Sequence, residues 1–212
     1  MIRRPRSARE LWLTARYLAR RLLSPAPPCP ERCDGRSRLV YGEKAWVNDE
    51  ESPDQRAIDA ALPGLARAHS RILHVGVGSS ALARRWAGRV AAIDGLTVVE
   101  AEAAHAERLG LARYRVFLAD KYREIPVQGP YDLILDNNLS SFTCCISHFR
   151  EMFARYVELL APGGYILTER RGMAYAQPGA FALSMADLRA IAERHKLQVS
   201  ERGSVVLMRR GA

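Results

Sequence analysis

The stretch that decides the fold is SRILHVGVGSSALARRWAGRVAAIDGLTVVE, residues 70–100. It opens with a short apolar run at 72–75, which has the length and composition of a buried parallel strand. The run breaks into the turn GVGSS at 76–80 and then becomes helical over 81–86. Glycines let the chain turn tightly and let a ligand approach the backbone. The stretch therefore predicts a strand, a glycine turn and a helix that present backbone N–H groups to a nucleotide.

Two placements of the second strand stay open. Residues 97–99 are strongly β-prone and lead through Glu100 straight into a helix. Residues 89–94 form the other candidate, which ends in Asp94. An acid at the end of this strand can accept hydrogen bonds from both hydroxyls of a ribose. The stronger β-propensity favours the first placement, with Glu100 as that acid.

Polar residues follow the next two predicted strands. The third strand, 114–118, is followed by Asp120, and the fourth, 131–136, ends in Asp136-Asn137-Asn138. Ligands of open α/β sheets lie outside the carboxyl ends of the strands, so the side chains of residues 136–138 are expected to face the cleft. Asn and Asp are also common turn and cap residues, so one of the three is alternatively only structural.

The remainder continues the alternation of helices and strands. A helix is predicted over 149–160, and the turn LAPGG at 160–164 leads into a fifth strand. Ser184 caps a helix over 185–196, and residues 198–200 and 204–209 form a closing antiparallel pair.

Over about residues 55–210 the chain resembles class I S-adenosylmethionine (SAM) dependent methyltransferases. The resemblance rests on the glycine turn, on YDLILD at 131–136 and on LAPGGYILT at 160–168. The first family motif is changed at two positions, where His74 replaces an acidic residue and Ser80 replaces a third glycine. The resemblance implies a doubly wound α/β fold with a mostly parallel seven-stranded sheet and an antiparallel last strand. The chain adds a helical N-terminal extension, which the resemblance does not cover.

The resemblance also implies contacts with SAM. These contacts are expected at the glycine turn and after the second, third and fourth strands. The residues are Gly76, Gly78, Ser79, Glu100, Asp120 and Asn137. Within this set Glu100 is expected to bind the ribose and Asp120 the adenine amino group. His74 stands where the family acid contacts the methionyl ammonium group, and is either a partial substitute or a core histidine. We favour the core histidine.

Asp136 and His148 are the candidate catalytic bases. A histidine near neutral pKa suits removal of a proton from a hydroxyl or an amine. His148 is alternatively a cap or surface residue, and Asp136 is alternatively a ligand of the cofactor amino group.

Missing motifs narrow the acceptor. The fourth strand lacks the Asn/Asp-Pro-Pro-aromatic motif of amino-methylating nucleic-acid enzymes, and Cys144 and Cys145 lack the Pro-Cys context of cytosine-carbon enzymes. The Asp and Asn ligands of catechol-type enzymes are missing near the fifth strand, so no metal site is expected. The sequence therefore predicts a metal-independent enzyme that methylates oxygen or nitrogen of a small molecule or peptide. Two alternatives are an RNA methyltransferase anchored by a basic N-terminal helix and a non-catalytic protein that kept the fold.

Composition fits one α/β domain with an extension. The chain has 212 residues, 48% of them hydrophobic, and a formal net charge of +9. Residues 1–28 hold seven arginines and one acid, so most of the excess charge lies there and nucleic acid is not the favoured partner. No apolar run is long enough to span a membrane. The four cysteines form neither a zinc pattern nor a disulfide framework, which favours reduced thiols in a cytoplasmic protein.

The predicted domains divide at residue 53. The first part, 1–53, holds an amphipathic helix over 8–23, a Pro-rich linker over 24–30 and a segment that covers the cleft. Three roles are open for this helix. It packs on the main domain or covers its cleft, or it forms a homodimer or binds another protein, an anionic membrane or nucleic acid. The third role is a targeting peptide. The second part, 54–212, is the Rossmann-like domain and opens with a helix over 54–68, with Asp54 as its N-cap and Pro63 dividing it.

Overall fold

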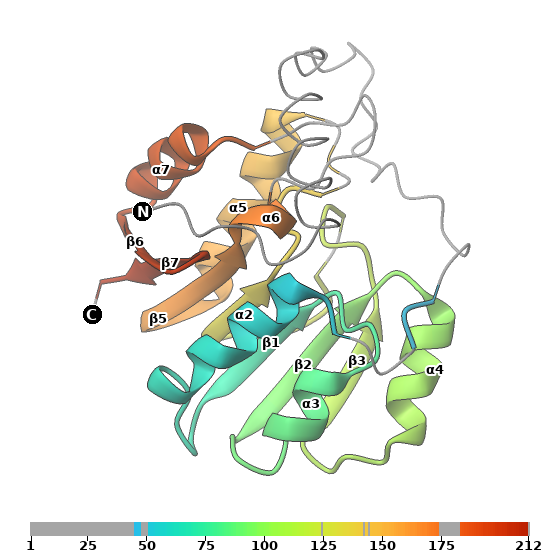
Figure 1. Cartoon of the computed structure of the whole chain (residues 1–212). Helices are drawn as coiled ribbons and strands as arrows, with labels where there is room; N and C mark the ends of the chain where they lie inside the picture. Colours follow the sequence, from blue (N-terminus) through green and yellow to red (C-terminus); the bar gives the residue numbers. More distant parts are fainter. Residues whose placement is uncertain are drawn as a thin grey trace, which may run out of the picture.

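Seven strands form one sheet in a computed structural model of the chain, which describes residues 45–47, 51–123, 125–141, 143, 145–173 and 183–211. The predicted N-terminal helix and the Pro-rich linker lie outside these residues. The strand order is β3-β2-β1-β4-β5-β7-β6 (Figure 1). The strands are β1 Arg71–Val75, β2 Ala92–Thr97, β3 Tyr114–Leu118, β4 Tyr131–Asp136, β5 Leu160–Glu169, β6 Leu197–Arg202 and β7 Val205–Arg210.

Only β7 runs against the other strands. The pairs β1–β2, β1–β4, β2–β3 and β4–β5 are parallel, whereas β7 is antiparallel to both β5 and β6. This arrangement confirms the predicted fold class, including the closing antiparallel pair. Because β1 lies at the centre, the carboxyl ends of β1 to β4 meet at one edge of the sheet.

Helices cover both faces of the sheet (Figure 1). Side chains of α2, α3 and α4 pack on one face, and those of α5 and α7 pack on the other. The second layer is centred on Phe149, Phe153 and Tyr156, whose side chains are fully buried. The helices are α2 Pro53–Ala61, the 3-10 turn η1 Leu62–Gly64, α3 Ala81–Trp86, α4 Glu100–Arg108, α5 Ile146–Leu159, α6 Arg170–Met173 and α7 Met185–Arg194.

The preferred placement of the second strand was wrong. The sheet takes Ala92–Thr97, between the two candidates, and Val98 and Val99 lead into α4. Gly95 gives the reason, because a Cβ there would lie 2.6 Å from Cγ1 of Val77 in the glycine turn. Glycine disfavours strands by local propensity, yet here the close packing of the turn requires it.

The helix after residue 51 starts earlier than predicted. Ser52, not Asp54, is its N-cap, and the Ser52 hydroxyl accepts from the Gln55 N–H while the Gln55 side chain accepts from the Ser52 N–H. This reciprocal pair is a capping box, a stronger start signal than a lone aspartate. The predicted division at Pro63 appears as the change from α2 to the short η1 turn, but the helix does not resume up to residue 68. No helix among the described residues is long and apolar enough to cross a membrane.

Candidate functional site

The glycine turn lies at the carboxyl end of β1, the central strand. Gly76 and Gly78 have positive φ angles of 78° and 50°. The Gly76 N–H donates to the Leu96 carbonyl of β2, which ties the turn to its neighbouring strand. Gly76 is exposed, and a Cβ added to it would meet nothing within 4 Å. Gly76 therefore offers exposed backbone to a ligand, whereas Gly78 is buried, with Gln55 and Trp46 close to it.

Ser80 stands at the position of the third glycine of the family motif and adopts a backbone conformation typical of glycine. It has φ 57°, ψ 23°, the left-handed conformation that glycine adopts without strain. Its buried hydroxyl lies 2.9 Å from the hydroxyl of Tyr114 on β3. This hydrogen bond offsets part of the backbone strain that the glycine would not have.

The carboxylate closest to the end of β2 belongs to Glu102, which the sequence analysis missed. Its Oε2 accepts a 2.6 Å hydrogen bond from the hydroxyl of Thr97, the last residue of β2. Its Oε1 accepts from the backbone N–H of Trp46 at 3.0 Å. Glu100, the predicted ribose acid, is the exposed first residue of α4. The turn of α4 that follows β2 thus carries two acids, of which Glu102 points back to the strand end.

Asp94, the alternative ribose acid, lies inside the sheet. Its Oδ1 accepts from Arg115 at 2.8–2.9 Å, and its Oδ2 accepts from the Tyr131 hydroxyl at 2.6 Å. It is 1% exposed. These contacts bind strands β2, β3 and β4 to one another away from the carboxyl edge.

Asp120 lies at the end of β3, next to an exposed apolar side chain. Its Oδ1 accepts from the Tyr122 backbone N–H at 2.9 Å, and Leu118 is 53% exposed. The Tyr122 ring is buried, and its hydroxyl donates to the Ser141 carbonyl at 2.8 Å. Tyr122 therefore anchors the loop after β4 and is not positioned to cover a ligand ring.

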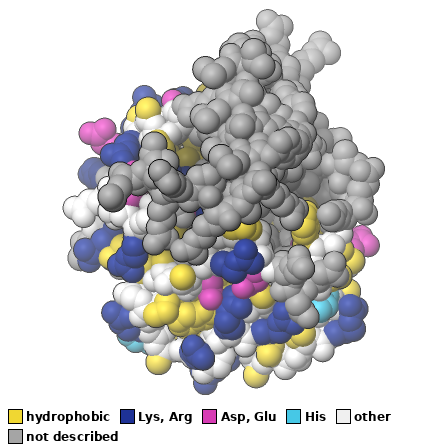
Figure 2. Space-filling model, viewed as in Figure 1, with side chains coloured by type: hydrophobic (Ala, Val, Ile, Leu, Met, Phe, Trp, Pro, Cys, Tyr) yellow, Lys and Arg dark blue, Asp and Glu magenta, His cyan; other side chains and the backbone are white. Residues whose placement is uncertain are grey.

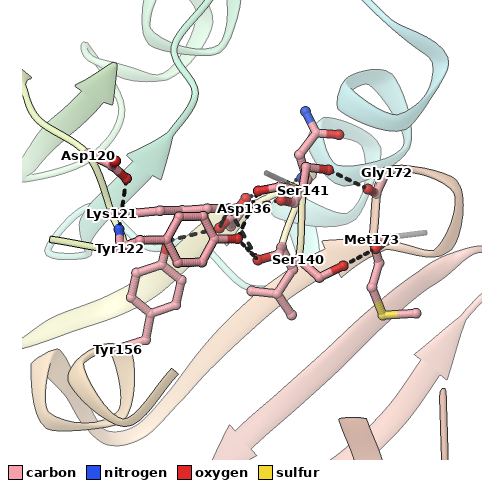
Figure 3. Close-up of polar contacts among 11 residues, drawn as sticks. Asp120, Lys121, Tyr122, Asp136, Ser140, Ser141, Tyr156, Gly172 and Met173 are labelled. Carbon is pink, nitrogen blue, oxygen red and sulfur yellow. Dashed lines mark hydrogen bonds and ion pairs between the residues drawn. The ribbon is translucent and has the colours of Figure 1, made fainter. Parts of the chain in front are cut away.

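Asp136 ends β4 inside a buried polar cluster (Figure 3). Its Oδ2 accepts from Lys121 Nζ at 2.7 Å and from the Tyr156 hydroxyl at 2.8 Å, and its Oδ1 accepts from the Asn138 N–H at 3.2 Å. Lys121 Nζ also donates to the carbonyls of Asn138 and Leu139. Burial, with the negative charge of Asp136, raises the pKa of Tyr156 well above its ordinary value. The cluster clamps the loop after β3 onto the loop after β4.

The loop after β4 also contacts the short helix α6 that follows β5. The hydroxyls of Ser140 and Ser141 donate to the carbonyls of Met173 and Gly172 (Figure 3). A Cβ at Gly172 would lie 1.9 Å from the Asn137 carbonyl oxygen, so only glycine fits there.

Of two other predicted site residues, Asn137 contacts α2, and His148 contacts the N-cap residue of its own helix. The Asn137 amide donates to Asp54 Oδ2 of α2 at 2.6 Å. His148 is half-buried in the first turn of α5, and its Nδ1 lies 3.4 Å from Cys145 Sγ. Within the described part of the chain, no three His, Cys, Asp or Glu side chains converge as metal ligands would.

A pocket lies between α2, the glycine turn and the end of β4, and His74 forms part of its wall. His74 is 5% exposed, and its Nδ1 has no hydrogen-bond partner among the described residues. Burial lowers the pKa of His74 to about 4, although the nearby charges of Asp136 and Asp59 act to raise it. The pocket is lined by Glu51, Gln55, Ile58, His74, Val77, Ser79, Ala81, Leu82, Leu135 and Asn137.

The fold is that of known SAM-dependent methyltransferases. The N-methyltransferase NodS from Bradyrhizobium japonicum WM9, in complex with S-adenosyl-L-homocysteine (SAH), superposes with a TM-score of 0.60 at 17% identity, over 79% of this chain and 95% of that one. The SAM-bound magnesium protoporphyrin IX methyltransferase ChlM from Synechocystis PCC 6803 superposes with a TM-score of 0.58 at 16% identity, over 78% of this chain and 88% of that one. The SAM-bound amino pentose methyltransferase CalS10 from Micromonospora echinaspora superposes with a TM-score of 0.57 at 15% identity, over 79% of this chain and 92% of that one. No protein-family model and no curated sequence matches the chain.

Proposed function

We propose that this chain is a metal-independent SAM-dependent methyltransferase that acts on oxygen or nitrogen of a small molecule or peptide. The observation that carries the proposal is the pairing of exposed Gly76, in the turn after β1, with the buried Glu102 carboxylate at the end of β2. Both features occur at the carboxyl edge where ligands of such sheets bind. The shared fold of NodS, ChlM and CalS10 supports the same conclusion.

The residues at this edge fit the parts of SAM. The open backbone at Gly76, with Gly78 and Ser79 beside it, would receive the methionyl part. Glu102 would accept hydrogen bonds from the ribose hydroxyls through Oε1, which accepts from the Trp46 N–H in this structure. Exposed Leu118 offers an apolar surface for the adenine next to Asp120. Glu100 and Asn137 remain predicted contacts.

The chemistry demanded of the chain is modest. SAM supplies, when bound, a methyl group on a sulfonium centre that is already a good leaving group. The protein must hold the acceptor in line with that methyl group and remove the acceptor proton where this is needed.

Between the two predicted bases, the contacts favour His148. Asp136 is 1% exposed and both of its oxygens accept hydrogen bonds from within the protein, which suits a residue that fixes the loop after β4. His148 is half-buried, and the contact of its Nδ1 with Cys145 orients the ring. We propose that Nε2 of His148 takes the proton and that Asp136 positions the loop.

Calorimetric titration with SAH tests the cofactor and the ribose acid together. The variants are Glu102→Gln and Glu100→Gln, with Glu107→Gln as the matched control on the exposed side of α4. We expect wild-type and Glu107→Gln proteins to bind SAH alike. We expect Glu102→Gln to weaken binding by about tenfold or more, because a charge-assisted hydrogen bond is lost.

A loss confined to Glu100→Gln would return the ribose role to Glu100 and leave the proposed function standing. If the wild-type protein binds neither SAH nor SAM, the proposed function is wrong and the non-catalytic alternative replaces it. Thermal unfolding of each variant separates lost binding from lost folding, since Glu102 also joins α4 to Thr97 and Trp46.

A further inference from the structure

A short segment before α2 lies against both of the features that carry the proposed cofactor site. Residues 45–47 run as irregular backbone beside the first turn of α4 (Figure 1). The Trp46 N–H donates to Glu102 Oε1 at 3.0 Å. On the other side, a Cβ added to Gly78 would lie 3.6 Å from the Trp46 carbonyl oxygen. The backbone of one residue therefore connects the proposed ribose acid with the glycine turn.

This contact takes the carboxylate oxygen that a ribose would need. Glu102 is 4% exposed, and its Oε2 accepts a 2.6 Å hydrogen bond from the Thr97 hydroxyl. Oε1 is then the oxygen left for a ligand, and it already accepts from the Trp46 N–H. Although a carboxylate oxygen has two lone pairs, a buried one leaves no room for a ribose beside the Trp46 backbone. The segment and the ribose therefore compete for the same position.

Displacement of the segment has a low cost. The Trp46 indole is 62% exposed, so its burial contributes little to holding the segment in place. A ribose hydroxyl would replace the Trp46 N–H as the donor, so Glu102 would keep a hydrogen bond at Oε1. Leu118, the proposed adenine surface, is 53% exposed in the same structure. The edge is thus open where the adenine would lie and closed at the ribose acid.

We propose that residues 45–47 form an autoinhibitory strap, in which the Trp46 N–H occupies the place of a ribose hydroxyl on Glu102 and leaves it when the cofactor binds. The proposal rests on the proposed function and adds a regulatory step to its site. The apparent affinity for the cofactor is reduced by the fraction of molecules in which the strap is open. A substitution that releases Glu102 from the strap therefore increases cofactor affinity without a change in the site itself.

Calorimetric titration of the full chain with SAH tests the strap through its backbone. Trp46→Pro removes the N–H, whereas Trp46→Ala removes the indole and keeps the N–H. Ala45→Pro is the matched control, because it places a proline in the same segment and keeps the Trp46 N–H. We expect Trp46→Pro to bind SAH about tenfold more tightly than wild type, since one charge-assisted hydrogen bond no longer opposes binding. Trp46→Ala and Ala45→Pro should bind SAH like wild type.

Hydrogen–deuterium exchange of the wild-type protein gives a second readout that needs no variant. Without ligand the Trp46 N–H is hydrogen-bonded, so a peptide covering 45–47 should exchange faster when SAH is in excess. Slower or unchanged exchange in that peptide would overturn the strap, because the segment would then stay in place over the bound cofactor.

The outcomes separate the strap from the proposed function. If SAH binds to Trp46→Pro with the same affinity as to wild type, or more weakly, the strap is overturned and the proposed function stands. Binding to Trp46→Pro alone would support both. If neither protein binds SAH while both unfold cooperatively on heating, the proposed function is wrong and the strap falls with it. If Trp46→Pro does not fold, the exchange of the wild-type protein decides.

Discussion

Ser80 shows how one side chain preserves a backbone shape that glycine would adopt more easily. Its left-handed conformation carries strain, and its hydroxyl contact with Tyr114 offsets part of it. The two effects are separable, because alanine keeps the strain and loses the hydroxyl, whereas glycine loses both.

We therefore expect Ser80→Ala to destabilise the fold by about 1–3 kcal/mol, since Tyr114 would lose its buried partner. Ser80→Gly should be about 1 kcal/mol less destabilising than Ser80→Ala, since the strain is relieved. Urea unfolding of both variants measures the difference, with Tyr114→Phe as the control for the hydroxyl pair. Equal losses in the alanine and glycine variants would show that position 80 is not strained.

His74 makes stability depend on pH. Its folded pKa of about 4 lies below its ordinary value of 6.5, so between these values the unfolded chain binds a proton that the folded chain does not. Stability should therefore fall as the pH is lowered through this window. From pH 7 to pH 5 the wild type should lose about 2 kcal/mol more than His74→Leu.

Urea unfolding at the two pH values checks this, with His69→Leu at an exposed position as the control. A wild type that loses no more stability than His74→Leu would mean that burial does not lower the pKa of His74 in the folded protein.

Side chains that act across elements could not be predicted from the sequence. Lys121 follows β3 yet binds Asp136 and the carbonyls beyond it, at sequence separations of 15 to 18 residues. Nothing in the local pattern marks a lysine for that role. Glu102 is likewise identified only by its contact with Thr97. By contrast, Gly76 and Gly78 were predictable, because a strand followed by a glycine turn is a local signal.

At the scale of elements, the buried Lys121–Asp136 ion pair joins the loops after β3 and β4, and we expect substitutions there to be strongly destabilising. Lys121→Met would leave buried Asp136 with the Tyr156 hydroxyl and the Asn138 N–H as the remaining partners of its side chain among the described residues. We expect a loss of about 3–5 kcal/mol, because breaking a buried ion pair leaves a charge without its counterion.

The double variant with Asp136→Asn should recover part of that loss, since the uncompensated charge is gone. Chemical unfolding of the single and double variants measures the coupling, with exposed Lys196→Met as the control. Additive losses would mean that the pair contributes no coupling energy to the fold.

Most elements followed from their local patterns, and the misplaced ones have a clear cause. The strand β4 and the capped helix α7 appear close to their predicted ranges because apolar runs and cap residues mark them. The strand β2 was shifted because Gly95 lowers the local β-propensity, while its packing against Val77 is a tertiary requirement. Tertiary packing overrides propensity where a strand must approach a turn closely.

At the scale of the whole molecule, the sheet order gathers the candidate site. Placing β1 between β2 and β4 brings the glycine turn, Glu102 and the Asp136 cluster to one edge. On the described part of the face drawn in Figure 2, lysine and arginine side chains are scattered and do not merge into one basic stripe.

The central claim is that SAM and SAH bind at this edge. Hydrogen–deuterium exchange of the full chain, measured by mass spectrometry with and without a large excess of SAH, tests it most directly. We predict slower exchange in peptides covering 76–80 and 97–102, and unchanged exchange in 197–210 at the far edge of the sheet. No change at 76–80 in the presence of SAH, or a change confined to 197–210, would contradict the account.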